Sequence, residues 1–122
     1  MNSSWEIIYY EKADGSVPVE DFINTLTVKQ AAKTKWEIDM LEQFGTALTM
    51  PYVRKISGEK YKGLSELRIQ FASDISRIFY FLPIGKQIVL LHGFVKKSQK
   101  TPSGELDMAL KNMNDYLRRN EQ

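Results

Sequence analysis

The sequence of 122 residues is long enough for one domain with a buried core and too short for two. It contains no cysteine, which excludes disulfides and thiolate metal sites, and a single histidine, which leaves no spacing of metal ligands. The net charge of +2 and the hydrophobic content of 43% are typical of a soluble globular protein. We therefore expect one domain over residues 1–122.

No apolar run reaches the roughly 18 residues of a membrane span, and residues 1–12 lack the basic region of a signal peptide. We therefore expect a cytoplasmic protein without a membrane partner. The charge is unevenly distributed. Residues 1–51 carry 4 Lys and Arg against 8 Asp and Glu, residues 52–100 carry 10 against 3, and residues 101–122 carry 3 against 4. A basic middle between acidic ends predicts a surface that faces a polyanion.

The first half of the chain predicts one strand and a pair of helices. Residues 5–10 form a β-rich run that is typical of a strand. A short amphipathic helix is expected to begin at Pro18, and a second one is expected between a Thr27 cap and Gly45. Two such helices predict a hairpin whose apolar stripes cover one face of a sheet. The apolar row of the second helix consists of Val28, Ala32, Trp36, Met40 and Phe44.

The second half predicts three strands. Residues 46–63 are expected to be irregular. After them apolar and polar residues alternate, which predicts a half-buried strand with Glu66 and Arg68 on the face exposed to water. Residues 76–82 are almost continuously apolar, which is typical of a central strand. Residues 87–95 predict the last strand.

A final helix completes the chain, with Thr101 as its cap and Pro102 at its first position. The predicted order is β-α-α-β-β-β-α. Three consecutive strands on short turns predict an antiparallel meander, and the first strand is expected to join its edge. The sequence thus indicates an α+β fold, in which an N-terminal helical hairpin and a C-terminal helix pack on a small, mostly antiparallel sheet.

Cations gather where the predicted strands end. Arg68 and Arg77 lie on neighbouring strands, and positions across a short turn can be neighbours on one face. Lys96 and Lys97 stand at the end of the last strand, with Lys100 just beyond. Such a cluster suits phosphate, because cations at a rigid strand end provide positive charge with little reorganisation. Further cations that could bind RNA or phosphate are Arg54, Lys55, Lys60 and Lys62.

RNA cleavage needs little more than these groups. A base takes the proton from the 2′-hydroxyl, which attacks the adjacent phosphate, and an acid protonates the departing 5′-oxygen. A lysine whose pKa is lowered by neighbouring cations can be the base, and arginines bind the phosphorane oxygens in pairs. This chemistry needs neither a metal nor another cofactor, because the 2′-hydroxyl is the internal nucleophile.

Each candidate also has a purely structural interpretation. Lysines at a strand end usually form a solvated rim, and Arg68 beside Glu66 is often a surface ion pair that contributes little. His92 shares a predicted face with Ile88 and Leu90, which favours a hydrogen-bonded core histidine over a catalytic one.

Four segments of the sequence resemble a known family. They are ELR at 66–68, RIFYF at 77–81, LLHGFVKKSQKTP at 90–102 and ELDMALKNMNDY at 105–116. Together with the PVEDFI helix start, they resemble the phage-derived, HigB-like branch of the RelE/ParE toxin superfamily over nearly the whole chain. The resemblance implies a RelE-like fold and the toxin of a type II toxin–antitoxin module. Such toxins are usually endoribonucleases, or mRNA interferases, that act on the ribosome.

The same resemblance implies partners and residue roles. The implied partners are mRNA on the ribosome, a neutralising HigA-like helix-turn-helix antitoxin, and operator DNA bound through the antitoxin complex. By motif position, Arg68 and Arg77 resemble the phosphate-holding basic residues of the superfamily. Lys96 and Lys97 match the basic pair after the last strand.

The sequence departs from the family pattern in two places. Some RelE-like toxins carry lysines on the second predicted strand and a tyrosine near residues 97–103, and both are missing here. The general base therefore stays open between Lys96 or Lys97, then Lys100, then His92. Two other functions stay open: a ParE-type inhibitor of DNA gyrase, and a catalytically inactive nucleic-acid-binding relative.

Overall fold

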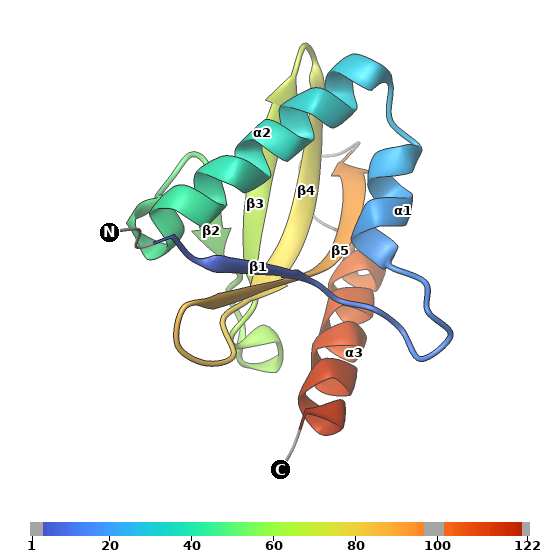
Figure 1. Cartoon of the computed structure of the whole chain (residues 1–122), viewed down its shortest axis with the longest axis vertical. Coiled ribbons are helices and arrows are strands. Elements are labelled where there is room, and N and C mark those ends of the chain that lie inside the picture. Colours follow the sequence, from blue (N-terminus) through green and yellow to red (C-terminus); the bar gives the residue numbers. More distant parts are fainter. Residues whose placement is uncertain (1–3, 97–101, 121–122) are drawn as a thin grey trace.

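The computed structural model describes residues 4–96 and 102–120, which form a five-stranded sheet with helices on both faces (Figure 1). The predicted α+β class is confirmed. In chain order the elements are β1 (Glu6–Tyr9), α1 (Pro18–Asn24), α2 (Val28–Phe44), β2 (Val53–Lys55), β3 (Ser65–Phe71), β4 (Asp74–Phe81), β5 (Gln87–Lys96) and α3 (Ser103–Arg119). Two short 3₁₀ turns lie at Gly45–Ala47 and Glu59–Tyr61.

The strands are ordered β1-β5-β4-β3-β2. β3, β4 and β5 form the expected antiparallel meander, and β1 joins its edge by pairing in parallel with β5. β4 lies in the middle of the sheet and is buried over most of its length, in agreement with its almost continuous apolar sequence.

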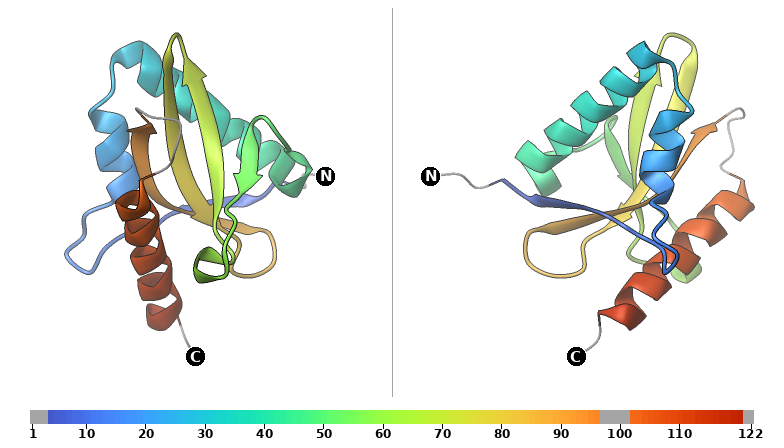
Figure 2. Two further views of the ribbon diagram at one scale, coloured as in Figure 1. Left: turned by 180° about the vertical axis from the view of Figure 1, so that it is seen from behind. Right: turned by 45° about the vertical axis from the view of Figure 1, so that its right-hand side comes forward.

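The helical hairpin of α1 and α2 covers one face of the sheet, and α3 covers part of the other (Figures 1 and 2). Buried side chains under the hairpin include Ile38, Leu41, Leu67, Ile78 and Leu90. Buried side chains under α3 include Phe79, Val89, Leu91, Ala109 and Met113. Because α3 begins about halfway along the sheet, the end of this face near the β3–β4 turn is left open by the described helices (Figure 2, left).

The ends of α2 follow local sequence signals. The Thr27 hydroxyl accepts from the Gln30 amide at 3.1 Å, while the Gln30 side chain accepts from the Thr27 amide at 3.2 Å, which forms a reciprocal capping box. Gly45 ends the helix at a φ of +51°. A side chain there would overlap the Trp5 ring, since a Cβ atom would lie 2.0 Å from Nε1. Both helix boundaries agree with the prediction.

The face that α2 buries is different from the predicted one. The expected row faces solvent, with Val28 88% and Trp36 52% exposed. The helix instead buries a side that contains polar residues, namely Thr34 and Glu37 together with Ile38 and Leu41. Thr34 is accommodated because its hydroxyl donates to the Gln30 carbonyl at 2.9 Å, and Glu37 because it pairs with Lys33 at 3.1 Å. The prediction of the buried stripe was therefore wrong.

The segment 46–63, expected to be irregular, contains the edge strand β2. Val53 lies opposite Leu67, and Lys55 lies opposite Ser65. Three residues are too few for an alternating pattern to stand out in the sequence, so the pairing with β3 reveals this strand where periodicity does not.

One extra residue interrupts the alternation of β5. His92 lies opposite Phe79 and Leu90 lies opposite Tyr80, so Leu91 is a bulge between two consecutive pairs. As a result Leu90 packs under the hairpin, whereas His92 turns toward the face that α3 covers. The expectation that His92 shares a face with Ile88 and Leu90 was therefore wrong.

The final helix begins one residue later than expected. Pro102 occupies its N-cap position and Ser103 its first turn, whereas Thr101 lies outside the described residues. None of the helices in the described ranges is long and apolar enough to cross a membrane.

Candidate active site

Cross-strand register builds a cationic surface on the open half of the α3 face. One row across the sheet runs from Arg54 on β2 through Glu66 on β3 to Phe79 on β4. The next row places Arg68 directly opposite Arg77. Because residues that pair across neighbouring strands project to the same side, the three arginines share one face.

Glu66 lies at the centre of this cluster. The carboxylate is completely buried, and its Oε2 accepts from Arg77 Nη1 and pairs with Arg54 Nη2 at 3.1 Å. The prediction that Glu66 lies on a face exposed to water was wrong, because Arg54 and Arg77 pack against its carboxylate, whereas Arg68 on the same face stays partly exposed. Glu66 instead fixes two arginines from two other strands.

Arg77 is the buried cation of the site. Only 6% of the residue is exposed, and burial lowers the pKa of its guanidinium, an effect that Glu66 opposes. The partly exposed Arg68 lies directly opposite Arg77 and adds its positive charge to the site. Two like charges in such positions repel each other, which an anion between them would relieve. Three arginines against one carboxylate leave an excess of positive charge.

A cavity of about 330 Å³ opens onto these groups. Its lining consists of Met50, Pro51, Val53, Arg54, Glu66, Arg68 and Arg77. Two buried atoms beside it, Arg77 Nε and Glu66 Oε1, have no hydrogen-bond partner in the described part of the chain. A buried polar atom without a partner is costly, so Arg77 and Glu66 are held in a desolvated position at the edge of the cavity.

Lys96 approaches the same cluster from the end of β5. It lies opposite Ile75, one row beyond the row of Arg68 and Arg77. Burial lowers the pKa of the Lys96 ammonium, and the nearby Arg77, Arg54 and Arg68 lower it further, while Glu66 opposes the shift. A lysine with a lowered pKa releases its proton more easily than an ordinary lysine and is a better candidate for a base.

His92 is bound outside this cluster. Its Nε2 lies 2.5 Å from Oε1 of Glu105 on α3, and its ring stacks at a centroid distance of 6.3 Å on Phe94. It lines a separate hollow beside Phe22 and Met108. This contact joins β5 to the first turns of α3.

The predicted RNA-binding lysines are dispersed. Lys55 points to the opposite face, because it pairs with Ser65 in register with Tyr80. Lys60 binds Asp107 of α3 at 3.1 Å, and Lys62 is exposed after a 3₁₀ turn. The structure therefore brings together Arg54, Arg68, Arg77 and Lys96. Lys97 and Lys100 lie outside the described residues.

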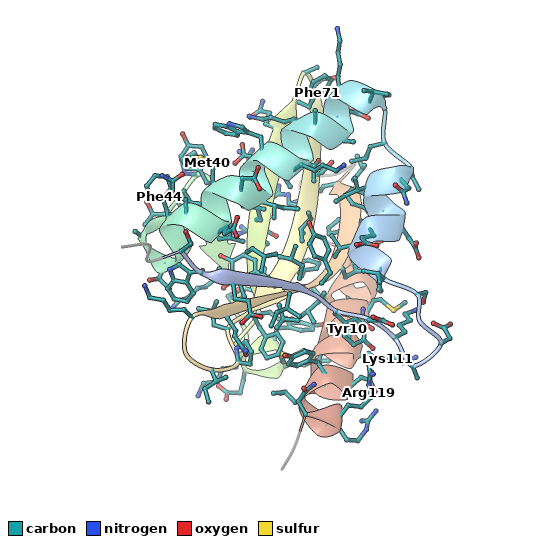
Figure 3. All side chains as sticks on the ribbon, viewed as in Figure 1. Tyr10, Met40, Phe44, Phe71, Lys111 and Arg119 are labelled. Atoms are coloured by element: carbon teal, nitrogen blue, oxygen red, sulfur yellow. The ribbon has the colours of Figure 1, made fainter. Side chains whose placement is uncertain are left out.

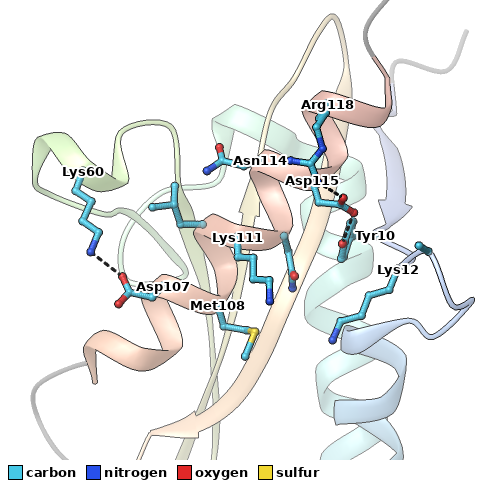
Figure 4. A pocket seen from close by; sticks show the side chains of 12 residues that line it. Tyr10, Lys12, Lys60, Asp107, Met108, Lys111, Asn114, Asp115 and Arg118 are labelled. Carbon is cyan, nitrogen blue, oxygen red and sulfur yellow. Dashed lines mark hydrogen bonds and ion pairs between the residues drawn. The ribbon is translucent and has the colours of Figure 1, made fainter.

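A wider hollow of about 700 Å³ runs along α3 (Figure 4). Four of its charged groups are paired: Asp115 accepts from the Tyr10 hydroxyl at 2.6 Å and pairs with Arg118 at 2.7 Å, and Lys60 pairs with Asp107. Among the described residues, the buried side-chain atoms without a partner belong to Glu66 and Arg77 and not to this hollow.

The sequence predicted a cluster of Arg68, Arg77 and Lys96, which the structure brings together, but it did not predict the part that Glu66 plays. The available signal was that Glu66 and Arg68 alternate onto one side of β3, which is the side that Arg77 also occupies. Arg54 was predicted as a further cation that could bind RNA or phosphate, but its place beside Glu66 was not predicted, because β2 was not expected.

The protein is thus an α+β protein with a mixed sheet, one face of which carries three arginines around a buried carboxylate, an arrangement suited to an anion. Residues 21–114 match the model of the family described as phage-derived Gp49-like proteins (DUF891). The chain belongs to this family, which is part of the RelE/ParE-like toxin superfamily of toxin–antitoxin systems. A search of curated proteins gave no match.

Proposed function

We propose that this chain is the toxin of a type II toxin–antitoxin module, of the HigB-like branch, and that it cleaves mRNA on the ribosome. The observation that carries the proposal is the cavity in which buried Arg77 meets Arg54 and Arg68 beside Lys96. Membership of a toxin superfamily with RNA-cleaving RelE-like members supports it.

The arginines bind the scissile phosphate. Guanidinium groups bind phosphate oxygens in pairs, and their charge is fixed, so they stabilise the extra negative charge of the phosphorane. Arg77 is held by Glu66 and Arg68 is partly exposed, so the first gives a rigid contact and the second an adjustable one.

Neutral Lys96 is the first candidate for the base. It takes the proton from the 2′-hydroxyl, the 2′-oxygen bonds to phosphorus, and the bond to the 5′-oxygen breaks. The products are a 2′,3′-cyclic phosphate and a 5′-hydroxyl once an acid protonates the leaving oxygen. Lys97 and Lys100 are further candidates for base or acid, and His92 is the weakest because it is already bound to Glu105.

The proposed partners follow from this activity. The toxin acts on mRNA in the cytoplasm, where ribosomes translate. Lys60 and Lys62 contact RNA beyond the cavity, whereas Lys55, on the opposite face of the sheet, is the least suited of the three. A HigA-like helix-turn-helix antitoxin neutralises it, and the complex binds operator DNA through the antitoxin. Lys60 and Lys62 are exposed, which suits contacts with a flexible polyanion.

The test is inducible expression of the wild type, Arg68→Ala and Lys96→Ala in bacteria, followed within minutes by mapping of new mRNA 5′ ends. We expect ends clustered within translated codons in the wild type only, and these ends should carry hydroxyl groups that need phosphorylation before ligation. Arg68 and Lys96 suit this test because neither makes the buried contact to Glu66. Arg118→Ala on α3 is the matched control and should cleave like the wild type.

Three results separate the alternatives. Codon-clustered ends in the wild type and control, but in neither site variant, support the proposal. Growth arrest with intact mRNA contradicts it in favour of a ParE-type gyrase inhibitor, which a supercoiling assay then tests. Absence of arrest contradicts it in favour of an inactive nucleic-acid-binding relative.

A further inference from the structure

The exposed side of α2 carries a continuous apolar row. Val28, Ala32, Trp36 and Phe44 are exposed and Met40 is half-buried. Met40 and Phe44 are labelled on α2 in Figure 3, on the helix layer that faces away from α3. No other described element packs over this row, and an apolar row of one helix in a monomer marks an interaction surface.

The row is self-complementary about its middle residue. Trp36 is the central member of the row. When a second copy runs in the opposite direction, a smaller residue before Trp36 on one helix meets a larger residue after Trp36 on the other. An antiparallel second copy places Ala32 against Met40 of its partner, while Val28 and Phe44 lie at the margins of the contact. Rows with a spacing of four are the ridges that pack into one another when two helices cross at about −50°.

The charges of α2 follow the same symmetry. The exposed Lys29 and Lys35 lie in its first half and the exposed Asp39 and Glu42 in its second half, and none of them makes an ion pair within the described part of the chain. An antiparallel copy therefore places each basic half against an acidic half. A parallel copy would oppose like charges.

This charge order works against the helix itself. The helix dipole favours acidic residues in the first turn and basic residues in the last. In α2 the first turn contains Lys29 and no acid, and the last turn contains Glu42 and no base. A partner of opposite polarity offsets that cost, whereas solvent alone does not.

From these observations we propose that the chain associates with a second copy of itself through an antiparallel, two-fold symmetric α2–α2 contact centred on Trp36. A single helix crossing buries less than the 1,200–2,000 Å² of a standard stable interface, so we expect a reversible dimer with a Kd of roughly 10–500 µM. The contact lies on the sheet face opposite the arginine cavity, so both cavities stay open in the dimer. This inference goes beyond the proposed function.

Cysteine cross-linking tests the geometry directly, since the natural chain has no cysteine. Trp36→Cys should form a disulfide-linked dimer with itself under mild oxidation. Ala32→Cys and Met40→Cys should each link poorly alone and efficiently when mixed, because the two-fold axis pairs them with each other. Lys111→Cys, exposed on α3, is the control for random collision.

Charge reversal gives an independent readout by sedimentation velocity. Lys35→Glu and Asp39→Lys should each weaken self-association, and an equimolar mixture should restore a dimer, because each altered residue then meets an opposite charge. If Lys35 and Asp39 only stabilised their own helix, the mixture of the two variants would form no more dimer than either variant alone. Trp36→Ala should lower the fraction of dimer at least tenfold at concentrations near the Kd.

Each contrary result overturns the proposal. A wild type that stays monomeric over about two orders of magnitude around the expected Kd excludes the dimer, and a different protein found on this row would then be its occupant. Self-linking of Ala32→Cys without mixed linking indicates a parallel contact. Equal linking of Lys111→Cys and Trp36→Cys indicates collision only.

Discussion

Arg77 reaches diagonally from β4 to β3, where its Nη1 donates to Oε2 of the completely buried Glu66. The same oxygen pairs with Arg54, so one carboxylate holds cations from two strands. A buried ion pair stabilises a fold little compared with apolar residues, but loss of one partner leaves a buried charge. Glu66 is therefore best understood as the residue that positions Arg77.

The first prediction concerns this pair. Glu66→Ala should lower the free energy of unfolding by about 3–5 kcal/mol, because Arg77 then stays buried without its counter-ion. The double variant Glu66→Ala/Arg77→Met should recover most of the loss. Urea unfolding measures both, with Asp107→Ala, which removes the exposed pair with Lys60, as a control expected to change far less. A single variant as stable as the control would contradict the positioning role.

The second prediction concerns the base. Because the base must be neutral, the rate of cleavage should rise with pH and level off above the lowered pKa of Lys96. Lys96→Arg keeps the positive charge but cannot release its proton in this range, so we expect the rise to vanish and the rate to fall about 10²–10⁴-fold. Single-turnover cleavage of ribosome-bound mRNA, followed from about pH 6 up to the ordinary lysine value of about 10.4, measures this.

Lys111→Arg on α3 is the matched control for that experiment. If Lys96→Arg keeps the profile of the wild type, the base is Lys97 or Lys100, and the same substitution at those positions decides between them.

The third prediction concerns alkaline stability. Burial raises the pKa of Tyr80 to about 12, while a hydrogen bond with Ser65 partly opposes this. Since the folded-state pKa is raised, the tyrosine contributes full stability below pH 10, and this contribution is lost as the pH rises toward 12. The loss is about 2–3 kcal/mol at roughly 1.4 kcal/mol per unit of pKa. Tyr80→Phe should show a smaller loss in urea unfolding over this range, and equal losses would contradict the assignment to Tyr80.

The fourth prediction concerns the attachment of α3. Asn112 is buried, and its Nδ2 donates to the carbonyl of Leu91 at 2.9 Å. Asn112→Ala leaves that carbonyl without its partner, so we expect a loss of about 1–3 kcal/mol in the free energy of unfolding. The neighbouring exposed Asn114→Ala should leave stability nearly unchanged. Similar losses in the two variants, compared by thermal or urea unfolding, would mean that helix propensity and not this bond is responsible.

Local signals predicted much of this fold from the sequence. The Thr27 cap, the Gly45 stop and the alternation of β3 each act within a few residues, so they could be read directly. The central position of β4 also followed, because a strand covered on both faces must be apolar on both.

The failures depended on contacts between distant residues. The buried face of α2 could not be inferred, since Thr34 and Glu37 are made tolerable by hydrogen bonds and an ion pair that the apolar pattern does not reveal. The strand β2 exists through its pairing with β3, and the pairing brings Arg54 to Glu66. The clustering of Arg68, Arg77 and Lys96 was therefore predictable from the sequence, whereas the buried Glu66 that organises the cavity and the position of Arg54 were not.

The bulge at Leu91 has a consequence for how relatives of this chain should be aligned. Ile88, Leu90 and Lys96 are all even-numbered, yet the first two pack under the hairpin and Lys96 joins the arginines. Without the inserted residue, a lysine at the same distance from Ile88 would project from the other face of the sheet. In a relative that lacks the bulge, the residue equivalent to Lys96 therefore lies one position earlier in the sequence, and the alignment needs a one-residue gap in this strand. An alignment that ignores this gap would compare a lysine of the site with one on the opposite surface.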